Sequence, residues 1–222
     1  MVLSAYIHLI GAQEHLLHKD GGKVFLENTY NSSIVKRDGL LDVNLISTNN
    51  VAIDERVVNC LDHDMVFFPI NIERKHWYLG VVNARECEIH VLDSYGDAFA
   101  ACNDLAVPII GLQRQIDIMA KKKELKNQRW RDLRVSEWLV VKKITTPVQK
   151  DGSSCGLFMI NYMEYWTGTL LSDNVTQNDM ENFRLKLIAI LWDSELNTMK
   201  ACPDSEPNDN KGEESSGFYP MS

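Results

Sequence analysis

A single cysteine, Cys155, stands between a polar loop and an apolar segment, and this position could make its thiol a nucleophile. The loop runs from Lys150 to Ser154 and contains Gly152, which permits a sharp turn before the thiol. If a helix begins at Cys155, its free N–H groups and positive dipole end would stabilise the thiolate, the reactive form of cysteine. The ordinary alternative is a buried structural thiol, because free cysteines are among the most buried residues.

The residues after Cys155 predict the helix that this chemistry needs. Apolar side chains follow at a density and near-helical spacing typical of a buried helix. They are Leu157, Phe158, Ile160, Tyr162, Met163 and Trp166. Gly156 has no side chain, so a substrate backbone could approach the thiol closely. The sequence therefore places Cys155 in the first turn of a buried helix.

A nucleophilic thiol also needs a base, a group that orients the base and a donor for the oxyanion. His76 is the candidate base, which would take the thiol proton and later protonate the leaving amine. Asp93 would hold the imidazole in the required tautomer. Gln149 would direct its side-chain amide to the oxyanion, beside the Cys155 backbone N–H. Taken singly, each has an ordinary structural explanation, as a strand-end histidine, a turn aspartate or a loop glutamine.

The clearest β pattern explains how His76 and Asp93 could meet. Three runs rich in β-branched and aromatic residues, Val66–Ile72, His76–Val82 and Glu88–Asp93, are joined by short polar turns. In an antiparallel pair the start of one strand lies beside the end of the next, so we expect His76 and Asp93 at the same sheet edge. The chain order His, Asp, Gln, Cys excludes the connectivity of papain, in which the cysteine comes first.

The remaining pattern predicts mainly helices around these strands. We expect a helix from Val2 to about Leu17, a second from Asp104 to about Lys126, a strand from Trp138 to Ile144, and a last helix capped by Gln177-Asn178-Asp179. Residues 23–64 give no detailed assignment. The first helix begins almost at Met1 without a preceding cap, which indicates a domain without its natural beginning. Residues 1–200 are expected to form one domain, and residues 201–222 a disordered acidic tail.

Composition narrows the class of protein. The net charge of −8 over 222 residues argues against a general nucleic-acid binder. The five cysteines are scattered and include no Cys-x-x-Cys pair, so a disulfide framework and a zinc site are not expected and a reducing compartment is. No apolar run approaches the length of about 20 residues that spans a membrane, and the start lacks the basic leader of a signal peptide.

Taken together, these motifs resemble the catalytic core of the ubiquitin-like-protein-specific proteases, the SUMO or sentrin proteases. In the identity of their residues they are most similar to the plant members of that family. The resemblance extends over about residues 1–196. It is carried by Phe68-Pro69-Ile70-Asn71-Ile72 leading to His76-Trp77, by Val91-Leu92-Asp93-Ser94, and by Gln149 with Cys155-Gly156 six residues later. Two features differ: the family's opening Trp-Leu-x-Asp motif would lie before Met1, and Ser154 stands where the family usually has aspartate.

The resemblance implies an α+β, papain-like thiol protease without a cofactor or metal, which cuts after the C-terminal Gly-Gly of a ubiquitin-like modifier, most directly SUMO. It assigns the triad to His76, Asp93 and Cys155 and the oxyanion hole to Gln149. Trp77 would line a narrow channel that admits only the diglycine, since larger side chains are excluded. It further implies a monomer in the nucleus or cytoplasm whose partners are the modifier and its conjugates, with neither nucleic acid nor membrane.

An alternative hypothesis retains the predicted fold without catalytic activity. The chain would then be a catalytically impaired modifier-binding protein derived from such a protease. The absent front tryptophan favours this alternative, and the complete set of four candidate catalytic side chains opposes it. A modifier with a reactive end separates the two, because only an ionised and correctly placed thiol becomes covalently labelled.

Overall fold

The sheet is built around the three consecutive strands that the sequence predicts. In the computed structural model, which describes residues 2–46, 50–98, 102–122, 125 and 129–198, they are β3 (Met65–Ile72), β4 (His76–Asn83) and β5 (Glu88–Leu92). Each pairs antiparallel with the next. β-Branched and aromatic residues favour this pleated, buried geometry. The short turns between the strands keep them in sequence order.

Three further strands complete a six-stranded sheet in the described part of the chain, in the order β1-β2-β3-β4-β5-β6. They are β1 (His18–Lys19), β2 (Gly22–Leu26) and β6 (Leu139–Lys142). β2 runs parallel to β3, and β6 runs parallel to β5. Parallel neighbours require long crossover connections, which here contain helices.

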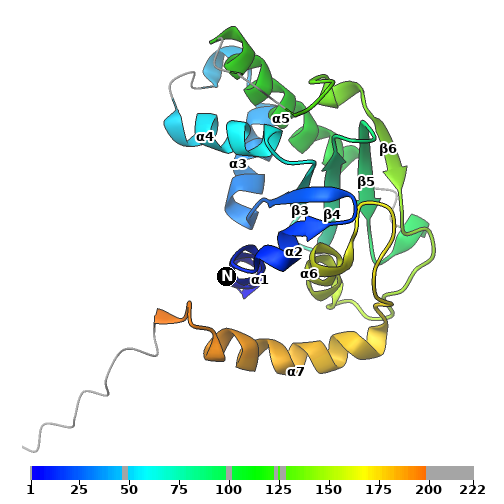
Figure 1. Cartoon of the computed structure of the whole chain (residues 1–222). Coiled ribbons are helices and arrows are strands. Elements are labelled where there is room, and N and C mark those ends of the chain that lie inside the picture. The colour runs from blue at the N-terminus through cyan, green and yellow to red at the C-terminus, as the bar shows by residue number, and fades with distance from the viewer. Residues whose placement is uncertain (1, 47–49, 99–101, 123–124, 126–128, 199–222) are drawn as a thin grey trace, which may run out of the picture.

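The helices form a layer on each face of this mixed sheet (Figure 1). One layer contains α3 (Thr29–Leu40), α4 (Val51–Leu61) and α5 (Cys102–Lys121). The other contains α1 (Val2–Gly11), α6 (Cys155–Tyr165) and α7 (Gln177–Asp193). Shorter elements connect them: α2 (Glu14–Leu17) and the 3₁₀ turns η1 (Val43–Leu45), η2 (Gly96–Ala98) and η3 (Val135–Glu137).

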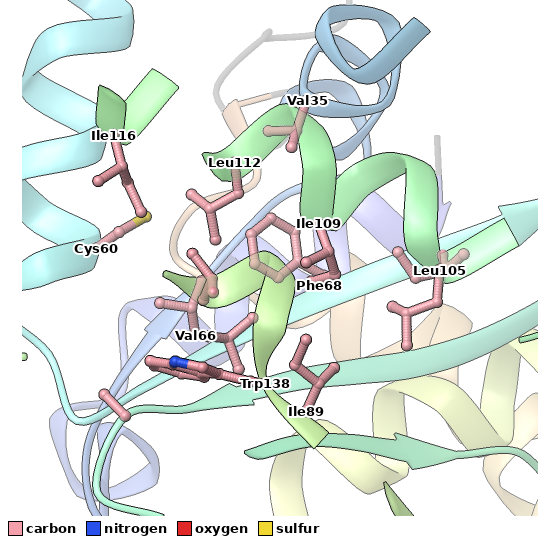
Figure 2. Close-up of a cluster of buried hydrophobic side chains, with 14 of the residues drawn as sticks. Val35, Cys60, Val66, Phe68, Ile89, Leu105, Ile109, Leu112, Ile116 and Trp138 are labelled. Carbon is pink, nitrogen blue, oxygen red and sulfur yellow. The ribbon is translucent and has the colours of Figure 1, made fainter. Parts of the chain in front are cut away.

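Strand β3 shows why the core has two halves. Val66 and Phe68 point into the cluster under α3, α4 and α5, which Figure 2 shows, and Met65 and Phe67 point into the cluster around α6. Alternate residues of a strand face opposite sides, so a strand covered on both faces becomes an unbroken apolar run. The sheet is therefore buried where it carries the candidate site residues.

Helices α3 and α5 approach each other so closely that a side chain is excluded between them. A Cβ atom added to Gly111 would lie 1.9 Å from the Val35 carbonyl oxygen, and one added to Gly39 would lie 2.0 Å from the Val107 carbonyl oxygen. Glycine at both positions lets the two backbones meet. This contact fixes the crossover helix α5 against the first helical layer.

Several predicted boundaries were wrong in detail. The helix expected from Val2 to about Leu17 is two helices, because α1 ends at Gly11 and the chain turns before α2. The last helix is capped by Thr176, which forms a reciprocal capping box with Asp179, instead of by residues 177–179. α5 ends at Lys121, and β6 is shorter than the predicted strand.

The described part of residues 23–64, to which the sequence assigns no detailed structure, contains most of strand β2, helices α3 and α4 and the 3₁₀ turn η1. The predicted tail, residues 201–222, lies outside the described residues. Within the described ranges, the helices are all too short or too polar to cross a membrane.

Candidate active site

Cys155 is the first residue of helix α6, as its sequence context predicts. The helix is buried along almost its whole length between the sheet and helices α1 and α7, which explains its apolar sequence. Its first turn is closed by the Ser154 carbonyl, which accepts from the N–H groups of Leu157 and Phe158 at 2.9 and 3.0 Å. Cys155 is 6% exposed, so its side chain is buried at the start of this helix.

His76 and Asp93 meet at the edge of the sheet. Leu79 of β4 pairs with Leu92 of β5, so His76, three residues before Leu79, lies near the residue that follows β5. The distance between His76 Nε2 and Asp93 Oδ1 is 2.8 Å. Both side chains are buried, at 3% and 6% exposure, and the contact therefore lies away from bulk water. The antiparallel argument from the sequence is confirmed.

The His76 ring and the Cys155 thiol influence each other's protonation, which links this pair to the start of the helix. Burial opposes protonation of His76, but the hydrogen bonds to Asp93 and Cys155 outweigh it and raise the pKa of His76 to about 9. Burial acts to raise the pKa of Cys155, but hydrogen bonds from His76 and from the backbone N–H groups of Trp77 and Gly156 lower it below its ordinary value. The two shifts favour a thiolate–imidazolium pair.

Gln149 lies buried on the loop that leads to Cys155. Its Oε1 accepts from Ser94 Oγ at 2.6 Å, and its Nε2 donates to the Asp151 carbonyl oxygen at 2.7 Å and to Tyr95 Oη at 3.2 Å. A carbonyl oxygen only accepts, so this contact fixes which end of the amide faces the loop. The side chain is thus held in one orientation, and its part as the oxyanion donor stays a prediction.

Trp77 and Gly156 lie next to each other. A Cβ atom built on Gly156 would lie 3.6 Å from Trp77 Cδ1 and 3.0 Å from Leu3 Cδ1. The absence of a side chain at position 156 therefore lets Trp77 and helix α1 approach the start of α6. Trp77 is half-buried, consistent with an aromatic wall beside the thiol. Their predicted role in admitting a diglycine stays a prediction.

Two residues at this site were missed by the sequence analysis, Tyr95 and Asp151. The Tyr95 ring stacks on the His76 ring with centroids 4.9 Å apart, and its hydroxyl donates to the Asp151 carbonyl at 2.9 Å. The Asp151 carboxylate accepts from Ser154 Oγ at 2.6 Å and from Ser154 N at 2.9 Å. The Asp151-Gly152 pair signalled a turn. No pattern in the sequence distinguished Tyr95.

Among the described residues, one group that could hold a metal ion lies outside this site. Glu86, Glu88 and His90 bring their ligand atoms within 4.8 Å of one another. His90 Nε2 lies 3.1 Å from a carboxylate oxygen of each glutamate, and Lys143 Nζ lies 3.3 Å from Glu88. Burial and the nearby Lys143 lower the pKa of His90, so its neutral ring donates from Nε2, and Lys143 with Glu88 is the ion pair of the cluster.

The sequence of this chain is similar to sequences of one protease family. The sequence model of the Ulp1 protease family, C-terminal catalytic domain, matches residues 46–191. Ubiquitin-like-specific protease 1A of Arabidopsis thaliana is 29% identical over 125 residues, which are 56% of this chain and 22% of that protein. A sentrin-specific protease of Caenorhabditis elegans is 26% identical over 133 residues, 60% of this chain and 17% of that protein. The chain thus spans about a fifth of the length of these relatives.

A solved structure confirms the fold class. The C-terminal Ulp1 protease domain, solved in complex with Smt3, the yeast ortholog of SUMO, superposes with a TM-score of 0.54 at 15% identity, covering 86% of this chain and 74% of that one. The predicted α+β, papain-like architecture is therefore confirmed.

Proposed function

Because the chain belongs to the Ulp1 protease family, we propose that it is a cysteine-type peptidase and isopeptidase that cleaves after the C-terminal Gly-Gly of a ubiquitin-like modifier, SUMO most directly. The observation that carries the proposal is the buried His76–Asp93 contact of 2.8 Å, with the same imidazole lowering the pKa of the Cys155 thiol at the start of α6. A surface histidine or a structural cysteine has no need of this arrangement. It is the geometry of a base, its orienting group and a nucleophile.

The proposed reaction gives each of the four groups a role. The Cys155 thiolate attacks the carbonyl carbon of the last glycine, and the charge that develops on the oxygen is stabilised by the Cys155 N–H and the Gln149 amide. His76 gives its proton to the leaving amine, which departs and leaves a thioester. A water molecule, deprotonated by His76, then hydrolyses the thioester and releases the modifier with its free carboxylate. Asp93 orients the imidazole throughout.

Selection of the substrate would come from exclusion around Trp77. The indole lies against the start of α6, where Gly156 leaves no side chain in the way. An extended diglycine is narrow enough to lie between such surfaces, whereas a residue with a side chain is not. The names of the relatives and the Smt3 complex support a SUMO-type modifier and its conjugates as partners.

We extend the proposal to the cellular compartment, the oligomeric state and the domain bounds of the enzyme. The described cysteines Cys60, Cys87 and Cys155 are free thiols, which suits a reducing compartment, the nucleus or the cytoplasm. The working unit would be a monomer made of residues 1–200. Residues 201–222 would be an acidic appendage to it.

The test is cleavage of a SUMO fusion by the full chain. We expect Cys155→Ala to abolish cleavage without changing the fold, whereas Cys87→Ala, which removes a half-buried thiol elsewhere, should cleave like the parent protein. A SUMO probe with an electrophilic end should label the parent protein and not Cys155→Ala. Persisting turnover in Cys155→Ala would reject the assignment of the nucleophile. A parent protein that binds SUMO and is not labelled would favour the modifier-binding alternative.

A further inference from the structure

Tyr95 contacts three residues of the candidate site, Asp93, His76 and Gln149. Its backbone N–H donates to Asp93 Oδ1 at 2.9 Å, the same oxygen that accepts from His76. Its ring stacks on the His76 imidazole, with centroids 4.9 Å apart and planes 28° apart. Its hydroxyl donates to the Asp151 carbonyl at 2.9 Å and accepts from Gln149 Nε2 at 3.2 Å. One residue thus links the imidazole arm to the carboxamide arm.

The direction of the two hydroxyl contacts is fixed. The Asp151 carbonyl can only accept, so the Tyr95 hydroxyl hydrogen points to it. The lone pairs of the phenol oxygen then remain for the Gln149 amide, which donates. Bonds arranged donor to acceptor in a chain polarise and strengthen one another. The carboxamide is consequently held between the turn after β5 and the loop before Cys155, where Nε2 also lies 3.1 Å from Asp151 Oδ1. Its two hydrogens are shared among three acceptors, so the longest of these contacts, to Tyr95 Oη at 3.2 Å, is the one that an oxyanion would share.

Holding this carboxamide matters because a free glutamine side chain is disordered. Fixing its rotamers costs conformational entropy, and a donor helps the reaction most when this cost has been met before the substrate binds. Tyr95 is only half-buried, and its hydroxyl lies outside the two apolar clusters of the core. Its contacts therefore serve the geometry of the site more than the stability of the fold.

We propose that Tyr95 is a positioning residue, whose hydroxyl preorganises Gln149 as the oxyanion donor while its ring and backbone keep the His76–Asp93 pair in register. This proposal rests on the proposed protease function. It assigns no contact with the substrate to Tyr95, which acts through Gln149 and His76.

The first test is the Tyr95→Phe variant of the full chain, which removes the hydroxyl and keeps the ring stacked on His76. We expect kcat for a SUMO fusion to fall about 5- to 20-fold with KM nearly unchanged, because an oxyanion donor that is loosened costs less than one that is removed, for which about 100- to 1,000-fold is typical. Alkylation of Cys155 by iodoacetamide should keep its rate, since it needs the thiolate and no oxyanion donor. A merely structural hydroxyl would move neither quantity.

Tyr165→Phe is the matched control. Tyr165 lies ten residues along α6 from Cys155, a distance of about 15 Å in a helix, and losing its hydroxyl should leave kcat unchanged. A kcat for Tyr95→Phe within twofold of the parent would overturn the proposal.

A second measurement separates this proposal from the proposed function. The side-chain amide of Gln149 gives a pair of nitrogen-15 NMR signals, which the Gln149→Glu variant identifies by their disappearance. In Tyr95→Phe these signals should shift, and their exchange with water should accelerate at least severalfold. Unchanged signals would overturn the positioning role even in a protein that cleaves no SUMO fusion. Loss of all cleavage in the parent protein, with the expected change of the signals, would contradict the protease function alone.

Discussion

Replacement of Asp93 by asparagine is the sharpest perturbation of the candidate site, because it removes a charge and keeps the shape. The asparagine oxygen can still accept from His76 Nε2 and from the Tyr95 N–H, which now lie 2.8 and 2.9 Å from Asp93 Oδ1. The change therefore tests the electrostatic effect of the carboxylate. Its expected target is the protonation state of His76.

The magnitude follows from the pKa of His76. Burial alone would lower this pKa, and the hydrogen bonds and charges of Asp93 and Cys155 raise it to about 9. If the carboxylate supplies one to two pKa units of that rise, its loss removes about 1.4 to 2.7 kcal/mol of preference for the imidazolium. With its pKa lowered from about 9 by this amount, His76 would stay at least about half protonated at pH 7 and would be about 10 to 50% protonated at pH 8, so kcat/KM should fall by at most about twofold at pH 7 and by about 2- to 10-fold at pH 8.

The assay measures the protonation of His76 and the reactivity of the Cys155 thiol. A histidine-selective NMR titration should show His76 releasing its proton at lower pH in Asp93→Asn. Alkylation of Cys155 at pH 8 should slow, because the imidazolium that stabilises the thiolate is less populated there; a thiol with an ordinary pKa of about 8.5 is only about a quarter ionised at that pH. The control is Asp97→Asn, whose carboxylate is exposed and pairs with Lys142 at 3.2 Å.

Two outcomes would refute this reasoning. If His76 titrates at the same pH in Asp93→Asn as in the parent, the carboxylate does not set its charge. If Asp97→Asn slows alkylation as much as Asp93→Asn does, the effect is a general loss of negative charge. Either result would return Asp93 to the role of a turn residue at a strand end.

Two further expectations concern pH and packing. Cleavage should fall as the pH rises through about 9, because a base with a raised pKa is protonated below that value and His76 must still carry a proton for the leaving amine; a rate that climbs steadily to pH 10 would contradict it. Gly111→Ala should lower the free energy of unfolding in urea by about 1–3 kcal/mol, because its Cβ would lie 1.9 Å from the Val35 carbonyl, whereas Gly11→Ala, with nothing within 4 Å, should change it by under about 0.5 kcal/mol. Equal losses in the two variants would show that the α3–α5 contact is not the cause.

The parts of the fold that the sequence predicted are those in which a local pattern and the tertiary structure agree. Strands β3 to β5 combine high β-propensity with short turns, and α6 is an apolar segment after a polar loop. The His76–Asp93 contact followed from these strands, because antiparallel neighbours leave little freedom at their ends. Structure that depends on residues close together in the sequence could therefore be predicted.

Contacts between residues far apart in the sequence were missed. Strand β2 pairs with β3, and about 40 residues that contain α3 and α4 lie between them. Nothing in the residues of β2 identifies β3 as its partner. Tyr95 was overlooked for a related reason: its hydroxyl bonds residues 54 and 56 positions away, on a loop whose path the sequence leaves open. A tyrosine after a strand has many ordinary explanations until that loop is placed beside it.

The loop before Cys155 shows how a difference from the family pattern can be compatible with an ordered site. Ser154 stands where the family usually has aspartate, and its hydroxyl donates to Asp151 Oδ2 at 2.6 Å while its N–H donates to Oδ1 at 2.9 Å. Burial acts to raise the pKa of Asp151, but these bonds outweigh it and hold the pKa far below its usual range, so the carboxylate stays charged. Arg184 approaches it at 3.8 Å. A carboxylate is thus present beside the start of α6, supplied from three residues earlier in the chain.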